Sequence, residues 1–436
     1  MGGALPHRGP WPCRSAADLA DARLTGVEEG DARKAAEMVA RRSYGKLVAF
    51  LAARTRDVAA AEDALAEAFA AALAHWPNRG VPDNPEAWLL AAAKRKAIDG
   101  HRAHKRSEAA SAHLTLMAEE LATVSIGEIP DERLKLLFAC AHPAIDQEMR
   151  APLMLQTVLG FDAAAIASTF LVSPTAMSQR LVRAKSRIRE SGIPFRVPPR
   201  EDLAERLPFV LDAIYAAYAE GWSDPMGTDA SARAMAGEAI WLGRLAAMLL
   251  PDEAEALGLL ALMLHSEARR AARRDGQGEF VPLSEQDAGL WDGAMMTEAE
   301  NLLRRAAAMN AIGRFQLEAA VQSAHAVRCR TGTADWPAIV TLYDALWTMT
   351  GSAVIAINRA VAIAETDGAE AGLAALNALD PKPLSQYQPY WSARAHLLAA
   401  TGAMDEARAA YDHAIGLEID PAVRRFLQQK KARLAH

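Results

Sequence analysis

The period of the apolar residues constrains the fold of this chain more than any other feature. Nearly every periodic segment of the 436 residues places apolar side chains at the spacing of an α-helix. Alanine, the strongest helix former, is abundant, and runs of β-branched residues, which favour strands, are scarce. The sequence therefore predicts an all-α protein.

Length and charge divide the chain. At 436 residues it is too long for one ordinary core, so we expect about two to four domains. Residues 1–200 hold 27 Lys and Arg against 23 Asp and Glu, a net charge of +4, whereas the remaining 236 hold 21 against 31, a net −10. A basic front half and an acidic back half suggest different partners. The linker between them is predicted in "SGIPFRVPPRED", residues 191–202, where three prolines interrupt helix.

Few residues suggest a catalytic site or a metal site. Cys13, Cys140 and Cys329 lie far apart and form no CxxC pair, so we expect a reduced, cytoplasmic compartment. Cys140 and His142 could supply two metal ligands, but no ligand cluster accompanies them, so we interpret both as core or boundary residues. The sequence offers no nucleophile with its base, no glycine-rich phosphate loop and no apolar run of membrane-spanning length. We therefore expect no enzyme activity, no cofactor and no membrane span.

A helix-start signal opens the stretch "VSPTAMSQRLVRAKSRIRES", residues 172–191. Ser173 can cap free backbone N–H groups, and Pro174 suits the first helical position. The preceding "LGFDAAAIASTFL" predicts a short helix capped by Asp162, followed by a turn of about four residues, which is helix-turn-helix spacing. An apolar stripe is predicted at Met177, Leu181, Ala184 and Ile188.

In a helix-turn-helix the second helix enters the major groove, with its first residues at the base edges. The residues expected to contact bases are Thr175, Ser178 and Gln179. The residues expected to neutralise phosphates are Arg180, Arg183, Lys185 and Arg187. The alternative is a solvated face whose basic residues only suit the helix dipole.

Two further helices precede this motif. "DVAAAEDALAEAFAAALAHW" predicts a helix over residues 57–76 with Asp63 and Glu67 on its more exposed side. Its predicted apolar stripe runs through Ala61, Leu65, Phe69 and Leu73. Residues 84–106, "NPEAWLLAAAKRKAIDGHRAHKR", predict a second helix that becomes basic enough for a nucleic-acid contact. Its basic residues are Lys94, Arg95, Lys96, Arg102, Lys105 and Arg106.

The back half, residues 201–436, predicts stacked helix pairs. Residues 390–421, "YWSARAHLLAATGAMDEARAAYDHAIGLEIDP", match the spacing of a 34-residue tetratricopeptide unit, and residues 353–379 form a looser copy. We expect polar residues such as Asp287 and Asp292 to satisfy helix ends rather than to form a site.

Taken in order, the acidic helix ending in "HWP", the basic helix, a polar tether and "AAAIASTFLVSPTAMSQRLVRAKSRIRES" resemble the two domains of an extracytoplasmic-function sigma factor. "DERLKLLFACAHPAID" and the helical tail resemble the subgroup with a C-terminal tetratricopeptide-like domain. The resemblance implies a region 2 domain (33–106), a region 4 helix-turn-helix domain (130–192) and a tetratricopeptide-like domain (193–436). The residues themselves predict a disordered lead (1–32) and a polar linker (107–129).

The same resemblance implies partners and roles. Asp63 and Glu67 would dock on core RNA polymerase, although Ala66 stands where the family commonly has glutamine. The basic helix would read and open the −10 element, with Arg95 where the family usually has asparagine. The residues implied to read the −35 element are Ser178, Gln179 and Arg180. Our hypothesis is that the acidic tail regulates or supports promoter use, with an unknown effector or protein as its partner; the charge favours masking of the basic modules, and the resemblance leaves the choice open.

Two other functions fit the residues. One is a helix-turn-helix repressor or activator that binds DNA by itself, and the other is a helical-repeat scaffold or enzyme with an incidental helix-turn-helix. The first would bind an operator tightly without polymerase; the second would have a ligand pocket and no association with polymerase.

Overall fold

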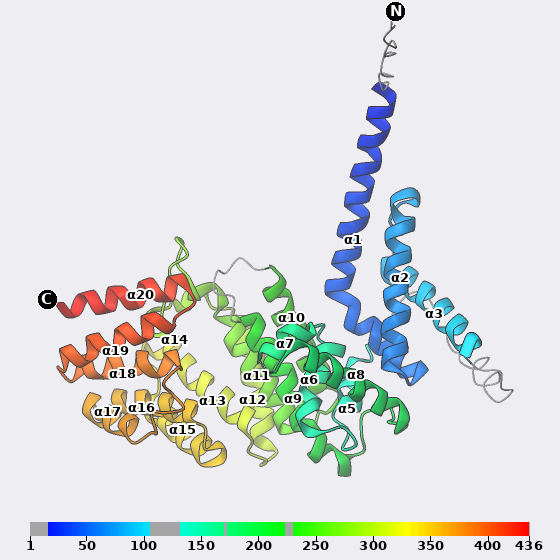
Figure 1. Cartoon of the computed structure of the whole chain (residues 1–436). Helices are drawn as coiled ribbons and strands as arrows, with labels where there is room; N and C mark the ends of the chain where they lie inside the picture. The colour runs from blue at the N-terminus through cyan, green and yellow to red at the C-terminus, as the bar shows by residue number, and fades with distance from the viewer. Residues whose placement is uncertain (1–15, 105–130, 170–171, 223–229, 436) are drawn as a thin grey trace, which may run out of the picture. The chain divides into compact units, whose positions relative to one another are not determined.

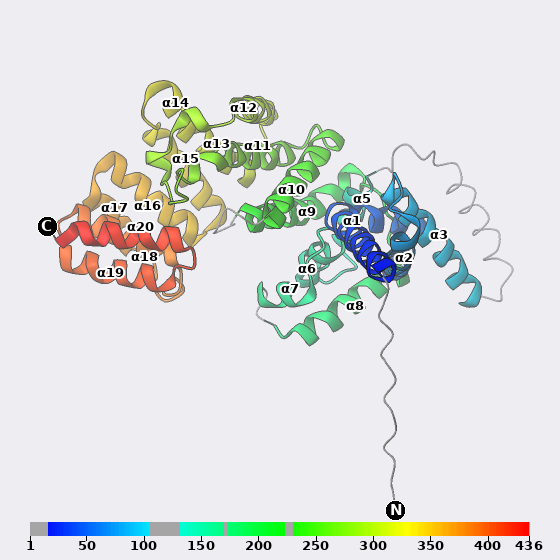
Figure 2. The same cartoon turned by 90° about the horizontal axis from the view of Figure 1, so that it is seen from above.

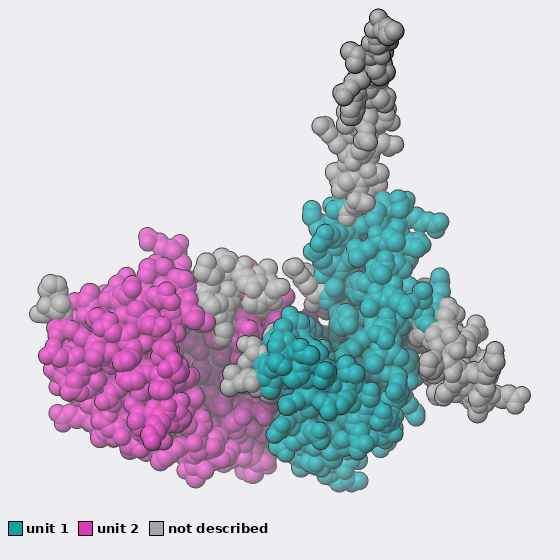
Figure 3. Space-filling model, viewed as in Figure 1, with its two compact units in different colours: residues 1–210 teal, residues 211–436 magenta. Residues whose placement is uncertain are grey.

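The computed structural model describes residues 16–104, 131–169, 172–222 and 230–435. In these ranges every regular element is a helix, no strand occurs, and an isolated β-bridge joins Arg274 to Phe280. The all-α prediction is therefore confirmed. The contacts divide the chain into unit 1, residues 1–210, and unit 2, residues 211–436, coloured separately in Figure 3.

Unit 1 begins with three helices, α1 (Ala16–Thr55), α2 (Val58–Arg79) and α3 (Pro85–His104). The second half of α1 packs along α2, and α3 packs on α2 as well (Figure 1). Alanines recur along the buried side of α2, which lets the neighbouring helix approach closely. The large side chains buried between the three helices are Leu47, Phe50, Leu65 and Leu89.

Two expectations for this region are wrong. Helix α1 begins at Ala16, so the predicted disordered lead, residues 1–32, is helical over its second half. This stretch has no proline and is rich in alanine and charged helix formers, which sustain a helix without a strong apolar stripe. On α2, Leu73 is 48% exposed, because Ala72 and Trp76 occupy the inward side.

Four shorter helices follow in unit 1. They are α5 (Arg133–Cys140), α6 (Gln147–Thr157), α7 (Ala163–Thr169) and α8 (Pro174–Glu190). Helix α7 ends four residues before Ser173, and α8 begins directly after it, so the predicted short helix and capped helix are present at the predicted spacing. The predicted apolar stripe of α8 is buried at Met177, Leu181, Ala184 and Ile188.

The two predicted DNA-binding modules, residues 33–106 and 130–192, touch each other within unit 1. Helix α1 packs against α5, and α2 packs against α8. At Gly45 on α1 the backbones meet, since a Cβ atom there would lie 2.1 Å from the carbonyl oxygen of Val158. The predicted tether, residues 107–129, lies outside the described residues. In this structure the modules thus form one packed body.

Cys140 and His142 have structural roles. The Cys140 Sγ atom is buried 3.6 Å from the hydroxyl of Thr157, and burial raises the pKa of the thiol to about 12. His142 accepts a hydrogen bond from the Ala144 N–H through Nδ1 at 3.1 Å. No group of three metal-ligating side chains occurs in the described part of the chain. None of its helices is both long and apolar enough to cross a membrane.

Unit 2 starts within α9, and among its first helices α10, α12 and α13 pack around α11. These elements are α9 (Arg200–Trp222), α10 (Ala230–Leu249), α11 (Ala254–Ala268), α12 (Gly293–Ala308), α13 (Arg314–Ala326), α14 (Arg328–Thr331) and α15 (Trp336–Thr350). Helix α11 is buried along almost its whole length. Its Glu255 carboxylate accepts hydrogen bonds from the N–H groups of Phe315 and Gln316, both at 3.0 Å, and so fastens the start of α13 to α11.

The rest of unit 2 consists of helix pairs and a final helix that lie side by side in both views (Figures 1 and 2). These are α16 (Ala353–Asp367), α17 (Ala369–Asn377), α18 (Gln388–Ala400), α19 (Met404–Leu417) and α20 (Pro421–Ala432). The helix pair predicted for residues 390–421 is present as α18 and α19. Gly402 turns the chain between them at φ 83°, a backbone angle that suits glycine.

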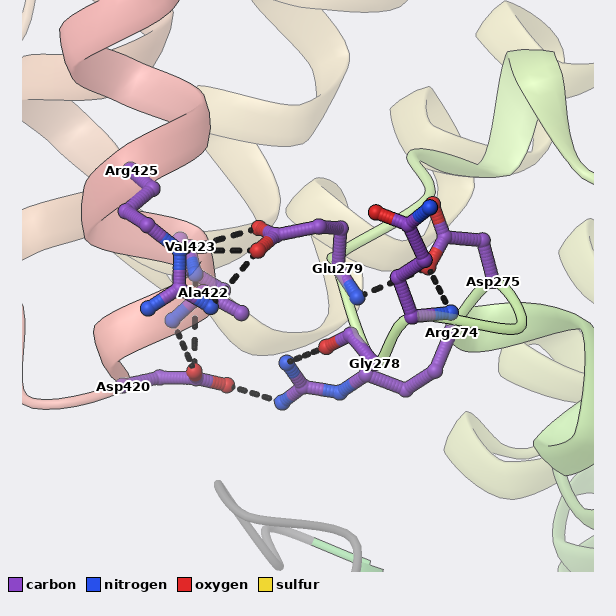
Figure 4. Close-up of polar contacts among 9 residues, drawn as sticks. Arg274, Asp275, Gly278, Glu279, Asp420, Ala422, Val423 and Arg425 are labelled. Atoms are coloured by element: carbon purple, nitrogen blue, oxygen red, sulfur yellow. Dashed lines mark hydrogen bonds and ion pairs between the residues drawn. The ribbon is translucent and has the colours of Figure 1, made fainter.

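A clasp joins the loop of residues 274–280 to α20 (Figure 4). Three pairs make up the clasp: Arg274–Asp420, Glu279–Arg425 and Phe280–Phe426. Asp420 also caps α20, because its carboxylate accepts hydrogen bonds from the first N–H groups of that helix. The clasp therefore fixes the beginning of α20 and the loop to each other.

Candidate nucleic-acid interface

Helix α8 owes its orientation to its cap and its apolar stripe. The Ser173 hydroxyl accepts a hydrogen bond from the Ala176 N–H at 3.2 Å, and Pro174 occupies the first turn. The stripe faces the core of unit 1, so the polar side chains of α8 point outward. The exposed residues include six of the predicted contacts: Thr175, Ser178, Gln179, Arg180, Arg183 and Arg187.

Three arginines of α8 line a cleft of about 790 Å³ between α8 and the start of α6. Arg180, Arg183 and Arg187 form no ion pair with any described residue, and the latter two reach backbone carbonyl oxygens at 3.4 and 3.5 Å. Guanidinium groups without acidic partners can bind phosphate, which accepts paired hydrogen bonds. Asp146 and Glu148 line the other side of the same cleft, so a nucleic-acid backbone would contact the arginine side, next to the exposed start of α8.

Lys185, the remaining basic residue of α8 predicted to contact phosphate, does not line this cleft. Its side chain is buried, and Nζ lies 2.6 Å from Oε2 of Glu62 on α2. One turn later, Arg189 lies 3.2 Å from Asp57, the residue that caps α2. In this arrangement Lys185 holds α8 against α2, and its predicted contact with phosphate would require the two helices to separate.

The pKa of Glu62, the partner of Lys185, is shifted as well. Burial raises the pKa of Glu62, and the charge and hydrogen bond of Lys185 act in the opposite direction. Burial together with the charges of Glu62 and Asp63 raises the pKa of Tyr44 to about 12. The contact between α2 and α8 is thus a desolvated polar junction, where an unpaired charge would be costly.

Helix α3 presents the basic residues predicted near the −10 element. Lys94 lies 5.8 Å from the ring of Phe50, and burial and the nearby Arg54 lower the pKa of Lys94. Arg95 is exposed on the same helix. Arg102 lies on α3 but its side chain is not among those described, and Lys105 and Arg106 lie outside the described residues.

The two predicted polymerase contacts, Asp63 and Glu67, are exposed on α2. Nζ of Lys96 on α3 lies 3.2 Å from Oε2 of Glu67. This ion pair joins a residue predicted to bind DNA to a residue predicted to bind polymerase. Reasoning from the sequence missed Asp57 and Glu62 as partners of α8. Their partners lie 132 and 123 residues away, and no local pattern signals a contact over that distance.

Known proteins match two parts of the chain. Residues 39–107 match the family described as sigma-70 region 2. This part of the chain therefore carries a sigma-70 region 2. The matched region contains the end of α1, all of α2 and the α3 helix described above. Residues 206–307 match a family of unknown function, DUF6596, which places α10, α11 and most of α12 in a family without an assigned role.

One relative resembles the chain over most of its length. An uncharacterized protein of Rhizobium meliloti (strain 1021) is 38% identical over 386 residues, which cover 87% of this chain and 91% of the relative. No solved structure matches. Helix α8 lies outside both matched stretches.

Proposed function

We propose that this chain, which carries a sigma-70 region 2, is an extracytoplasmic-function sigma factor that directs core RNA polymerase to a small set of promoters. The observation that carries the proposal is that α8, downstream of a sigma-70 region 2, buries its whole apolar stripe and exposes a polar and basic face. A helix of this kind after a short helix and a turn is the reading element of a helix-turn-helix.

In this proposal α8 reads the −35 element. Ser178 and Gln179 can form hydrogen bonds with base edges, and Arg180 can donate two to a guanine. Arg183 and Arg187 neutralise phosphates and set the register. Lys185 joins them only after its pair with Glu62 opens.

The first module carries the other two contacts. Asp63 and Glu67, both exposed on α2, dock on core polymerase, and the basic α3 helix reads and opens the −10 element. Removing a base from the stack costs a few kcal/mol, so a protein pocket must capture it. Two weak DNA readers fixed on one polymerase gain effective concentration at correctly spaced elements.

Unit 2 regulates or supports this activity, with an effector or protein as its ligand. The acidic charge of the back half favours a masking role, since residues 1–200 carry a net positive charge. Deleting residues 211–436 distinguishes the two roles. Increased transcription means that unit 2 inhibits, and lost transcription means that it supports.

Run-off transcription on fragmented genomic DNA tests the proposal, with purified core polymerase and with or without this protein. Discrete new transcripts that share two spaced upstream elements are expected. Arg180→Ala should weaken or abolish use of the −35 element, whereas Arg304→Ala, an exposed arginine on α12, should leave promoter choice unchanged. The absence of both transcripts and polymerase binding would refute the sigma-factor role.

A further inference from the structure

A cavity of about 640 Å³ lies in unit 2 between the end of α11, the 3-10 helix after it (Arg270–Arg273) and the beginning of α12. Four arginines contribute to its wall: Arg233, Arg270, Arg273 and Arg274. Leu290 and Met295 provide an apolar side. All of these residues fall within the DUF6596 match.

An indole ring fixes two of the arginines. The guanidinium carbons of Arg273 and Arg270 lie 4.2 and 4.8 Å from the ring centre of Trp222. Arg273 also donates to the carbonyl oxygen of Trp222 at 2.9 Å, and Arg270 pairs with Glu267 at 2.6 Å. Stacking on an aromatic face holds a guanidinium in place. All three nitrogens of Arg270 already donate to Glu267 or to the carbonyl oxygen of Gly221, whereas Arg273 keeps N–H groups that can bind a ligand.

Positive charge exceeds negative charge around this wall. Arg269 donates to the neutral amide of Gln322 at 2.8 Å, and Arg328 donates to the carbonyl oxygen of Gln286 at 2.9 Å. Within the described ranges Arg269, Arg273 and Arg328 form no ion pair. Burial and the neighbouring arginines lower the pKa of Arg273, and they lower that of Arg269 to about 10.

The acids nearby are already engaged. Asp292, which lines the cavity, accepts hydrogen bonds from the N–H groups of Ala294 and Met295 at 2.9 and 3.0 Å and so caps α12. Arg274 pairs with Asp420 in the clasp (Figure 4). Crowded, partly desolvated arginines are costly without a counter-charge, and a bound anion would offset this cost.

We propose that this cavity binds a small organic phosphate. Guanidinium groups match the oxygens of a phosphate with paired N–H donors, and several of them can surround one multiply charged group. Leu290 and Met295 would contact the organic part of the ligand. The volume falls in the range of small-molecule sites, about 300–1,000 Å³. This binding role goes beyond promoter recognition and needs no polymerase.

Titration calorimetry on the full chain tests the proposal with phenyl phosphate as the probe. Phenyl phosphate should bind more tightly than inorganic phosphate, which lacks the apolar part, and more tightly than benzoate, which carries one charge. Arg273→Gln should weaken binding at least about tenfold, and Arg304→Gln, outside the cavity, should not.

Because Arg273 also holds Trp222, its substitution could unfold the region, so a second pair of variants carries the test. Leu290 is 54% exposed and tolerates polar side chains. Leu290→Glu places a carboxylate at the wall and should raise the dissociation constant at least about tenfold relative to the neutral Leu290→Gln. Equal binding by these two variants, no binding of phenyl phosphate at millimolar concentration, or tighter binding of benzoate would each overturn the proposal.

Discussion

The pair between Lys185 and Glu62 should hold α8 against α2, and Lys185→Met tests this. The two side chains are only 10% and 18% exposed, so the substitution leaves a buried carboxylate without its partner. Breaking a buried pair in this way costs about 3–5 kcal/mol. The raised pKa of Glu62 lets the carboxyl group take up a proton, so we expect the lower end, about 3 kcal/mol.

Hydrogen exchange of the full chain, followed by mass spectrometry, measures this cost at α8. A loss of about 3 kcal/mol should speed exchange of the buried α8 amides by about 100-fold, since each 1.4 kcal/mol is about tenfold. The matched control is Lys96→Met, because the Lys96–Glu67 pair is 53% and 60% exposed and should contribute about 1 kcal/mol or less.

A double-mutant cycle completes the test. Glu62→Gln alone leaves Lys185 buried without a counter-charge, whereas the double variant leaves no buried charge and should recover most of the loss. The reasoning is refuted if Lys185→Met exchanges like Lys96→Met, or if the double variant loses the sum of the two single losses.

Other predictions concern packing, pH and the clasp. Gly45→Ala should destabilise unit 1 by about 1–3 kcal/mol in urea denaturation, because the added methyl meets the Val158 backbone. Gly30→Ala, with open space on the same helix, should be neutral or slightly stabilising, and equal losses would contradict the packing argument. Burial lowers the pKa of His265 to about 4, so the folded chain resists the proton that the unfolded chain accepts below about pH 6.5. The melting temperature of the protein should therefore fall as the pH is lowered from 6.5 to 4, and it should fall less steeply in His265→Met. An equal dependence of melting temperature on pH in the two proteins would refute this. Asp420→Ala removes both a helix cap and an ion pair, and should cost about 2 kcal/mol in protection of the α20 amides against exchange.

Helix starts could be predicted because their signals are local. The Ser173 hydroxyl and the side-chain amide oxygen of Asn84 each accept a hydrogen bond from the N–H three residues onward, as a capping residue does. Asp292 caps α12, as expected for a polar residue that satisfies a helix end. The period of α8 likewise revealed its apolar stripe, but it did not reveal that Lys185 on the polar side is buried against α2.

The contacts between distant residues could not be predicted. Glu62 is an ordinary acid on an alanine-rich helix until folding brings Lys185 beside it. The arginine-rich stretch after α11 gives no sign of a cavity, because the cavity needs Leu290 and the beginning of α12 to close it. Leu73 was misplaced because Ala72 and Trp76, rather than Leu73, face the core on this part of α2.

The clasp also has a consequence for synthesis on the ribosome. Phe280 and Phe426 are 146 residues apart, as are Arg274 and Asp420. At about 5–20 residues per second, the loop must wait about 7–30 s after translation before its partners exist. During that interval the Phe280 ring lacks its aromatic neighbour, so a nascent chain stalled before α20 should expose this loop to chaperones or proteases.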